Sequence, residues 1–130
     1  MNNPSKIVID ALEEMISTRS HDESKIALYF DQSYEQVVNG ECLDYRSFIQ
    51  HIAVLKEHIS RIELSILKIV SEGDTVFTHH TANVVKPDGT ESQFEVFARF
   101  TLCAGKIVRC EELTRMISGA SSDRDLGSRY

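Results

Sequence analysis

The sequence lacks the short motifs whose spacing alone defines a chemistry. No Ser or Cys lies in a nucleophile elbow, no Gly-rich loop could hold a phosphate, and no predicted helix carries two His residues at metal-ligand spacing. Basic residues number 14 against 20 acidic ones and form no cluster, whereas a nucleic-acid-binding protein normally carries a basic stripe. We therefore expect no metal, no cofactor and no nucleic-acid partner.

Cysteine is scarce, and long apolar runs are missing. Cys42, Cys103 and Cys110 are an odd number without metal-ligand spacing, which indicates reduced thiols in a cytoplasmic protein rather than a disulfide framework. The N-terminal segment is interrupted by Asp10 and Glu13, whereas a membrane span needs about 20 apolar residues. We expect a cytoplasmic location and no membrane partner.

The composition is that of an ordinary soluble domain. The chain of 130 residues is 42% hydrophobic and 26% charged, with a net charge of −6. This length suffices for one domain that buries most of its apolar surface. We expect that domain to span residues 1–117, followed by a polar tail over residues 118–130 that is rich in Gly and Ser.

Helical periodicity in the first sixty residues predicts three helices. The first begins at Ser5 as its N-cap, the second begins near His21-Asp22, and the third begins at about Asp44, which can cap it. Between the second and third helices, residues 34–38 have the β-branched and aromatic content of a short strand. The turn pair Asn39-Gly40 closes that strand.

The segment from Arg61 to Ile117 alternates apolar and polar residues and predicts four consecutive strands. Turns are expected at Glu72–Asp74, Lys86–Gly89 and Ala104–Lys106. A long antiparallel meander that follows short helices forms a curved sheet with helices on one face. The pattern therefore predicts an α+β fold that encloses a pocket.

Three local sequences in this order of elements resemble a known family. Tyr34–Gly40, Glu72–Val76 and the segment from Phe97 to Val108 are similar to the nuclear transport factor 2-like superfamily in its SnoaL-like branch. The resemblance covers about residues 6–117. It implies a cone-shaped, curved sheet, mixed but mainly antiparallel, wrapped around three N-terminal helices. The superfamily includes isomerases, cyclases, hydrolases, dehydratases and non-catalytic binding modules, so it leaves open whether this chain is an enzyme.

The resemblance excludes one reaction of that superfamily. Its ketosteroid isomerases need a carboxylate base near the first strand and an acidic donor on the third. The matching positions here are Val37 or Val38 for the base and Val96 for the donor. Because valine can neither accept nor donate a proton, ketosteroid isomerisation by that route is excluded.

Two ionisable side chains are expected to face the pocket. His80 shares its strand face with small apolar residues and could act as a general base, or it could be a core histidine satisfied by one hydrogen bond. Glu112 also points inward, which is costly for a carboxylate unless it is paired. It could be a general base or the orienting partner of His80, or it could form an ion pair with Arg99 or Arg115. We assign His80 and Glu112 as candidate catalytic residues.

The sequence thus predicts a SnoaL-like protein that binds an apolar small molecule in a conical pocket. The residues expected to contact the ligand are Tyr34, Val37, Phe94, Val96 and Cys110. Two interpretations of the activity stay open. One is a proton-transfer enzyme (isomerase, cyclase or dehydratase) of unknown substrate, and the other is a non-catalytic dimerisation or interaction module.

An apolar patch on the opposite face of the meander predicts a homodimer. Its members are Leu67, Ile69, Phe77, Val85 and Phe97. A monomer rarely keeps such a patch in water, so we expect a second copy of the chain to cover it.

Overall fold

The computed structural model describes residues 3–17 and 21–120 of the chain. Its helices are α1 (Pro4–Leu12), the π-helical turn η1 (Glu13–Ser17) that continues α1, α2 (Glu23–Tyr29) and α3 (Tyr45–His58). Its strands are β1 (Phe30–Val38), β2 (Glu41–Leu43), β3 (Arg61–Glu72), β4 (Thr75–Val85), β5 (Glu91–Cys103) and β6 (Lys106–Ser118).

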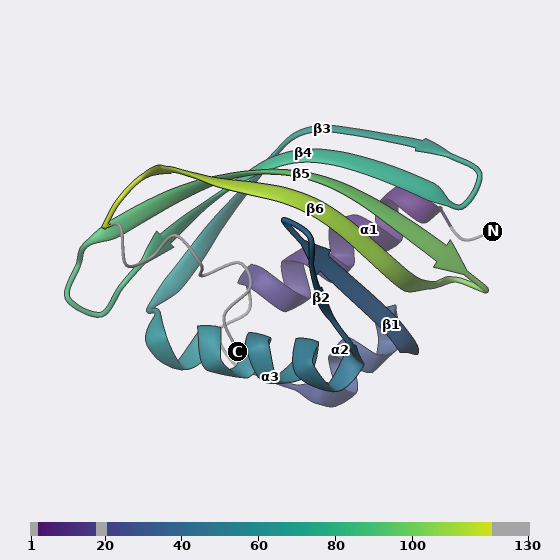
Figure 1. Cartoon of the computed structure of the whole chain (residues 1–130), viewed down its shortest axis with the longest axis horizontal. Coiled ribbons are helices and arrows are strands. Elements are labelled where there is room, and N and C mark those ends of the chain that lie inside the picture. Colours follow the sequence, from purple (N-terminus) through teal and green to yellow (C-terminus); the bar gives the residue numbers. More distant parts are fainter. Residues whose placement is uncertain (1–2, 18–20, 121–130) are drawn as a thin grey trace.

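The six strands form one curved sheet in the order β2-β1-β6-β5-β4-β3. Strand β1 runs parallel to β6, and every other neighbouring pair is antiparallel. Figure 1 shows the helices together on the concave side of this sheet. The predicted α+β architecture, with a mixed and mainly antiparallel sheet curved around N-terminal helices, is confirmed.

Two of the three predicted helix starts agree with the structure. Asp22 caps α2 and Asp44 caps α3, because each side chain accepts backbone N–H groups of the first turn. Helix α1 differs, since its N-cap is Asn3 and not Ser5. The Asn3 Oδ1 atom accepts the backbone N–H of Ser5 at 3.0 Å, and Pro4 takes the first helical position, where its missing N–H costs nothing.

The first strand is longer than expected and has a partner that we did not predict. Strand β1 begins at Phe30 rather than Tyr34, and the three-residue β2 pairs with its end. The turn between them is the predicted pair Asn39-Gly40, whose φ angles of 49° and 87° are those of a tight hairpin turn. A strand as short as β2 carries too few residues for a periodic pattern.

A bulge in β3 reverses the faces of its second half. The register shifts between Ile66 and Lys68, so that Leu67 is an extra residue. Beyond the bulge, Ile69 packs against the core and Val70 is half exposed. The prediction that Ile69 lies on the outer face is therefore wrong, because alternation fails where one strand gains a residue.

A second bulge lies at the start of β6. Leu102 pairs with Ile107 whereas Thr101 pairs with Arg109, which leaves Val108 as the extra residue. As a result Ile107 is fully buried in the same core cluster as Cys110. Strict alternation along β6 would instead place these two side chains on opposite faces of the sheet.

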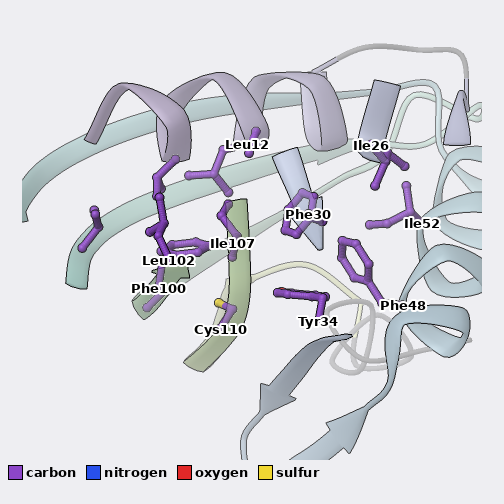
Figure 2. Packing of buried hydrophobic residues seen from close by; sticks show 14 of the residues in the cluster. Leu12, Ile26, Phe30, Tyr34, Phe48, Ile52, Phe100, Leu102, Ile107 and Cys110 are labelled. Carbon is purple, nitrogen blue, oxygen red and sulfur yellow. The ribbon is translucent and has the colours of Figure 1, made fainter. Parts of the chain in front are cut away.

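The core fills the space between the concave face and the helices. Figure 2 shows Leu12, Ile26 and Phe48 of the three helices packed toward Phe100 and Ile107 of the sheet. A smaller cluster of Ile62, Val84 and Phe94 lies toward the other end of the sheet. Both clusters contribute side chains to one cavity, which therefore lies between them.

The ends of the domain are only partly described. Strand β6 continues to Ser118, one residue beyond the domain boundary that we predicted. The rest of the predicted tail, residues 121–130, lies outside the described residues. No helix within residues 3–17 and 21–120 is long and apolar enough to cross a membrane.

Candidate functional site

The cavity has a volume of about 90 Å³ and lies under the concave face of the sheet. This is room for several water molecules or one small organic ligand. Most of its lining is aliphatic or aromatic. The polar side chains among its lining residues are Tyr34, Gln36, His51, His80, Glu112 and Thr114. No Lys or Arg in the described part of the chain contributes to the lining.

The strand register places the ionisable groups of the sheet in neighbouring rows. His80 on β4 lies beside Val96 on β5, which lies beside Thr114 on β6. Glu112 belongs to the adjacent row, beside Ala98. The strand β5 therefore separates His80 from Glu112. Among the described residues, His80 bonds to Thr78, whereas Glu112 bonds to Cys110 and Thr114. The suggestion that Glu112 orients His80 through a hydrogen bond is wrong.

Within the described part of the chain, Glu112 has two hydrogen-bond donors but no cationic partner. Its Oε1 accepts the Thr114 hydroxyl at 3.1 Å, and its Oε2 accepts the Cys110 thiol at 3.9 Å. Burial in the apolar cavity raises the pKa of the Glu112 carboxyl to about 7, against the lowering effect of these two donors. At neutral pH the side chain is therefore present in both its protonated and its ionised form.

The alternative of an ion pair with Arg99 or Arg115 is also wrong. The Arg99 Nη2 lies 2.7 Å from Glu111 Oε1, and the Arg115 Nε lies 2.7 Å from Glu95 Oε1. Both arginines belong to the outer face, as Glu111 does. The register thus places Glu112 on the cavity side, as predicted, and Glu111 on the outer face.

His80 is a neutral imidazole held at one of its nitrogens. Its side chain is 3% exposed, and Nδ1 shares a hydrogen bond of 3.1 Å with the hydroxyl of Thr78. Burial, followed by the neighbouring His79, lowers the pKa of His80 to about 4. The protein contacts are those of a core histidine with one hydrogen bond. His80 also lines the cavity, so it can present a neutral ring to a ligand.

A second polar group comes from β1. The Tyr34 hydroxyl donates to Gln36 Oε1 at 2.8 Å, and both side chains are buried. Burial raises the pKa of Tyr34 far above its usual range and does the same for the Cys110 thiol. These two groups therefore stay protonated and act as hydrogen-bonding groups, not as bases or nucleophiles.

The structure brings four of the five expected ligand-contacting residues to the cavity. These are Tyr34, Phe94, Val96 and Cys110. Val37 is placed elsewhere: the inward side chains of β1 are Tyr34, Gln36 and Val38, and Val37 lines a groove on the outer face.

Gln36 and His51 are polar lining residues that were not among those predicted to line the pocket. Gln36 follows Tyr34 by two positions in the same strand, which is the spacing of one strand face. His51 lies on α3 and is 3% exposed. It lies three residues after Phe48 in α3, so its helical spacing was the signal that we did not use.

Comparisons with known proteins agree with this geometry. The family model described as a SnoaL-like domain matches residues 12–110. An uncharacterised protein of Schizosaccharomyces pombe is 30% identical over 128 residues, which are 98% of each chain.

Solved structures share the fold at low identity. AclR of Streptomyces galilaeus, a candidate hydroxylase, has a TM-score of 0.75 at 12% identity over 98% of this chain and 86% of its own. An epoxide hydrolase of M. tuberculosis has a TM-score of 0.70 at 16% identity over 85% of this chain and 81% of its own. At these identities the two structures establish the fold alone.

Proposed function

The chain belongs to the SnoaL-like domain family, and from this premise we propose that its inner cavity binds an apolar small molecule on which Glu112 transfers a proton. The reaction class is that of an isomerase, a cyclase or a dehydratase. Each of these reactions can move a proton to or from carbon or oxygen without a metal ion. Among the described residues, no group of His, Cys, Asp and Glu side chains is arranged to hold a metal ion.

The observation that carries the proposal is the state of Glu112. A general base is most effective when its pKa lies near the working pH, and burial raises the pKa of this carboxyl to about 7. The cost of an ionisable group in an apolar cavity is normally offset by a counter-ion, and among the described residues no cationic side chain pairs with Glu112. Such perturbed groups concentrate at functional sites.

His80 supplies a second polar group to the proposed site. With Nδ1 bonded to Thr78, its Nε2 is the ring atom that is left for a ligand. A pKa of about 4 keeps the ring neutral at physiological pH. His80 therefore binds or polarises a ligand through one hydrogen bond, while Glu112 on the other side of β5 moves the proton.

Binding in the cavity is tested by filling it. We expect cyclohexanone or methylenecyclohexane to raise the melting temperature of the wild-type protein by several degrees at ten times Kd, since binding then stabilises by about 1.4 kcal/mol. Ala82→Leu places a larger side chain in the cavity and should abolish this shift. Thr81→Leu, on the other face of the same strand, is the matched control. An equal shift in the Ala82 variant would contradict binding at this site.

A specific surface feature favours a second role, as a dimerisation module. Val70, Phe77, Phe97 and Leu113 form an apolar patch on the outer face of the sheet, where each is 49–68% exposed. The patch differs from the one that we predicted. Val85 is 8% exposed at the end of its strand, and Ile69 faces the core. We propose that a second copy of the chain covers this patch.

The homodimer is tested at the centre of the patch. Phe97→Glu should convert the dimer into a monomer, because the interface would have to bury a carboxylate without a partner. Leu28→Glu is the matched control, since Leu28 is 66% exposed on α2 and far from the sheet's outer face. Light scattering at micromolar concentration gives the mass of each variant. A monomer mass for the wild-type protein would remove the proposal.

We also propose that the protein works in the cytoplasm. All three cysteines are free, and Cys42 and Cys103 are exposed. Exposed thiols persist in reducing compartments, whereas oxidising compartments tend to pair or modify them. Fluorescence microscopy of a tagged chain in its own host would test the location.

A further inference from the structure

We propose that the side-chain amide of Gln36 is the donor that binds a carbonyl oxygen of the ligand in the inner cavity. The ligand class is then an uncharged carbonyl compound with an apolar body. This inference rests on the proposed function, because it assigns a ligand class to the same cavity. It concerns a residue of β1 that is 5% exposed and lines the cavity.

The orientation of the Gln36 amide is set by Tyr34. The Tyr34 hydroxyl donates to Gln36 Oε1 at 2.8 Å, so the oxygen of the amide is occupied. Tyr34 itself is fixed, since its ring packs against those of Phe30 and Phe48 with centroid distances of 4.7 Å to each. Figure 2 shows this ring at the edge of the core, near Cys110. The two N–H donors of Gln36 therefore point away from Tyr34.

The amide nitrogen of Gln36 borders open space. The structure gives it no hydrogen-bond acceptor among the described residues. In the same part of the chain, the one fully enclosed side-chain nitrogen or oxygen without a partner is His21 Nδ1, so the Gln36 nitrogen is not enclosed. Because Gln36 as a residue is buried, the space that its nitrogen borders is the cavity.

The parallel pairing of β1 and β6 places this donor near Glu112. Gln36 lies beside Cys110, and Glu112 lies beside Val38, so Gln36 and Glu112 are diagonal neighbours on adjacent strands. Strand spacing of ~4.8 Å and a two-residue offset put their Cα atoms about 8 Å apart. Both side chains face the cavity, so a small ligand between them can contact both.

The charge of the lining selects against anions. No Lys or Arg among the described residues faces the cavity, and its sheet side carries the Glu112 carboxyl. A carboxylate or phosphate ligand would be buried beside this group without a cation, which is strongly unfavourable. A neutral carbonyl compound has an acceptor for Gln36 and needs no counter-ion.

This arrangement defines a balanced proton transfer. The Glu112 carboxylate takes the proton from the carbon next to the carbonyl, and the electron pair of that C–H bond moves to the carbonyl oxygen as an enolate. The Gln36 N–H donates to the oxygen as negative charge develops there. The protonated Glu112 then returns the proton to carbon, at the same or a conjugated position, and the enolate collapses to the carbonyl.

The test uses cyclohexanone and its hydrocarbon analogue methylenecyclohexane. We expect the infrared C=O stretch of bound cyclohexanone to move to lower frequency in the wild-type protein, because a hydrogen bond weakens the C=O bond. Gln36→Leu should abolish this displacement and weaken cyclohexanone binding roughly three- to tenfold, the effect of one neutral hydrogen bond. Binding of methylenecyclohexane should not weaken. Gln50→Leu, at an exposed glutamine of α3, is the matched control.

The Tyr34→Phe variant distinguishes an effect on the orientation of the Gln36 amide from an effect on folding. It keeps the ring but frees the Gln36 amide to rotate, so the bound C=O stretch should move part of the way back while the hydrocarbon still binds. An unshifted stretch in the wild-type protein, with cyclohexanone bound equally by wild type and Gln36→Leu, would overturn the role of Gln36 alone. Failure of both probes to bind the wild-type protein would overturn the binding cavity and this inference with it.

Discussion

Replacing Glu112 with Gln is expected to abolish the proposed proton transfer, measured in heavy water as the exchange of the α-hydrogens of cyclohexanone with deuterium. Gln keeps the shape of the side chain and can still accept the hydroxyl of Thr114. It cannot take up a proton. The loss should amount to roughly 10²- to 10⁴-fold in the catalysed rate, which is the usual contribution of a general base. Proton NMR follows the exchange directly, as the decay of the α-hydrogen signal.

The control for this experiment is a glutamate outside the cavity. Glu63 is exposed on the outer face of β3 and forms an ion pair with Arg61, so Glu63→Gln should exchange at the wild-type rate. Equal rates for wild type and Glu112→Gln would show that Glu112 is structural. Because the probe itself reports the proton transfer, the test needs no knowledge of the natural substrate.

Two titratable groups of the cavity, Glu112 and His80, should make the free energy of unfolding depend on pH in opposite directions. The pKa of Glu112 is raised from 4.5 to about 7, so its contribution is fully present below pH 4.5 and is lost as pH rises toward 7. The pKa of His80 is lowered from 6.5 to about 4, so its contribution is present above pH 6.5 and is lost as pH falls toward 4. In the wild-type protein the two contributions nearly cancel over this range.

Replacing each of these two side chains singly should reveal its contribution to the free energy of unfolding. Relative to wild type, Glu112→Gln should gain stability as pH rises from 4.5 to 7, and His80→Gln should lose stability over the same range. Each difference should reach about 3 kcal/mol, at 1.36 kcal/mol per pKa unit. Urea unfolding at several pH values measures both. Groups with lowered pKa on the outer face, such as Glu111, contribute equally to all variants and disappear from the differences.

If the free energy of unfolding of each variant differs from that of the wild-type protein by an amount that does not change with pH, the two pKa values are contradicted. This holds whether or not Glu112 is catalytic. Glu63→Gln again serves as the control, since its curve should follow that of the wild-type protein. This experiment is independent of ligand binding. It therefore tests the electrostatics of the empty cavity separately from its proposed function.

The sequence predicted the structure correctly where the pattern lies within a single helix or strand. Asp22 and Asp44 precede apolar helical stripes, and both cap helices. The inward faces of β4 and β5 follow simple alternation, so His80, Phe94 and Val96 were placed on the cavity side. In these elements the signal lies within a few consecutive residues.

The sequence did not predict which face of the sheet a side chain occupies where that face depends on pairing with a neighbouring strand. Ile69 and Ile107 changed sides because bulges insert one residue, and a bulge is a property of a strand pair. Tyr34 and Val37 stand three positions apart in one strand, so they cannot both face the cavity. Gln36 carries no signal by itself, and its significance appears only when β1 is known to lie beside β6.

During folding, the candidate site can form only after β1 has paired in parallel with β6. The Asn39 side chain bonds to both backbone groups of Thr114, across 75 residues of sequence, at the point where these strands meet. The hairpins of the meander close over short loops, whereas this contact must close a loop of 75 residues. Gln36 and Glu112 come together only in that step. Any intermediate that has formed the meander alone contains Glu112 without Gln36 beside it, so a ligand that contacts both side chains would recognise only the completed fold.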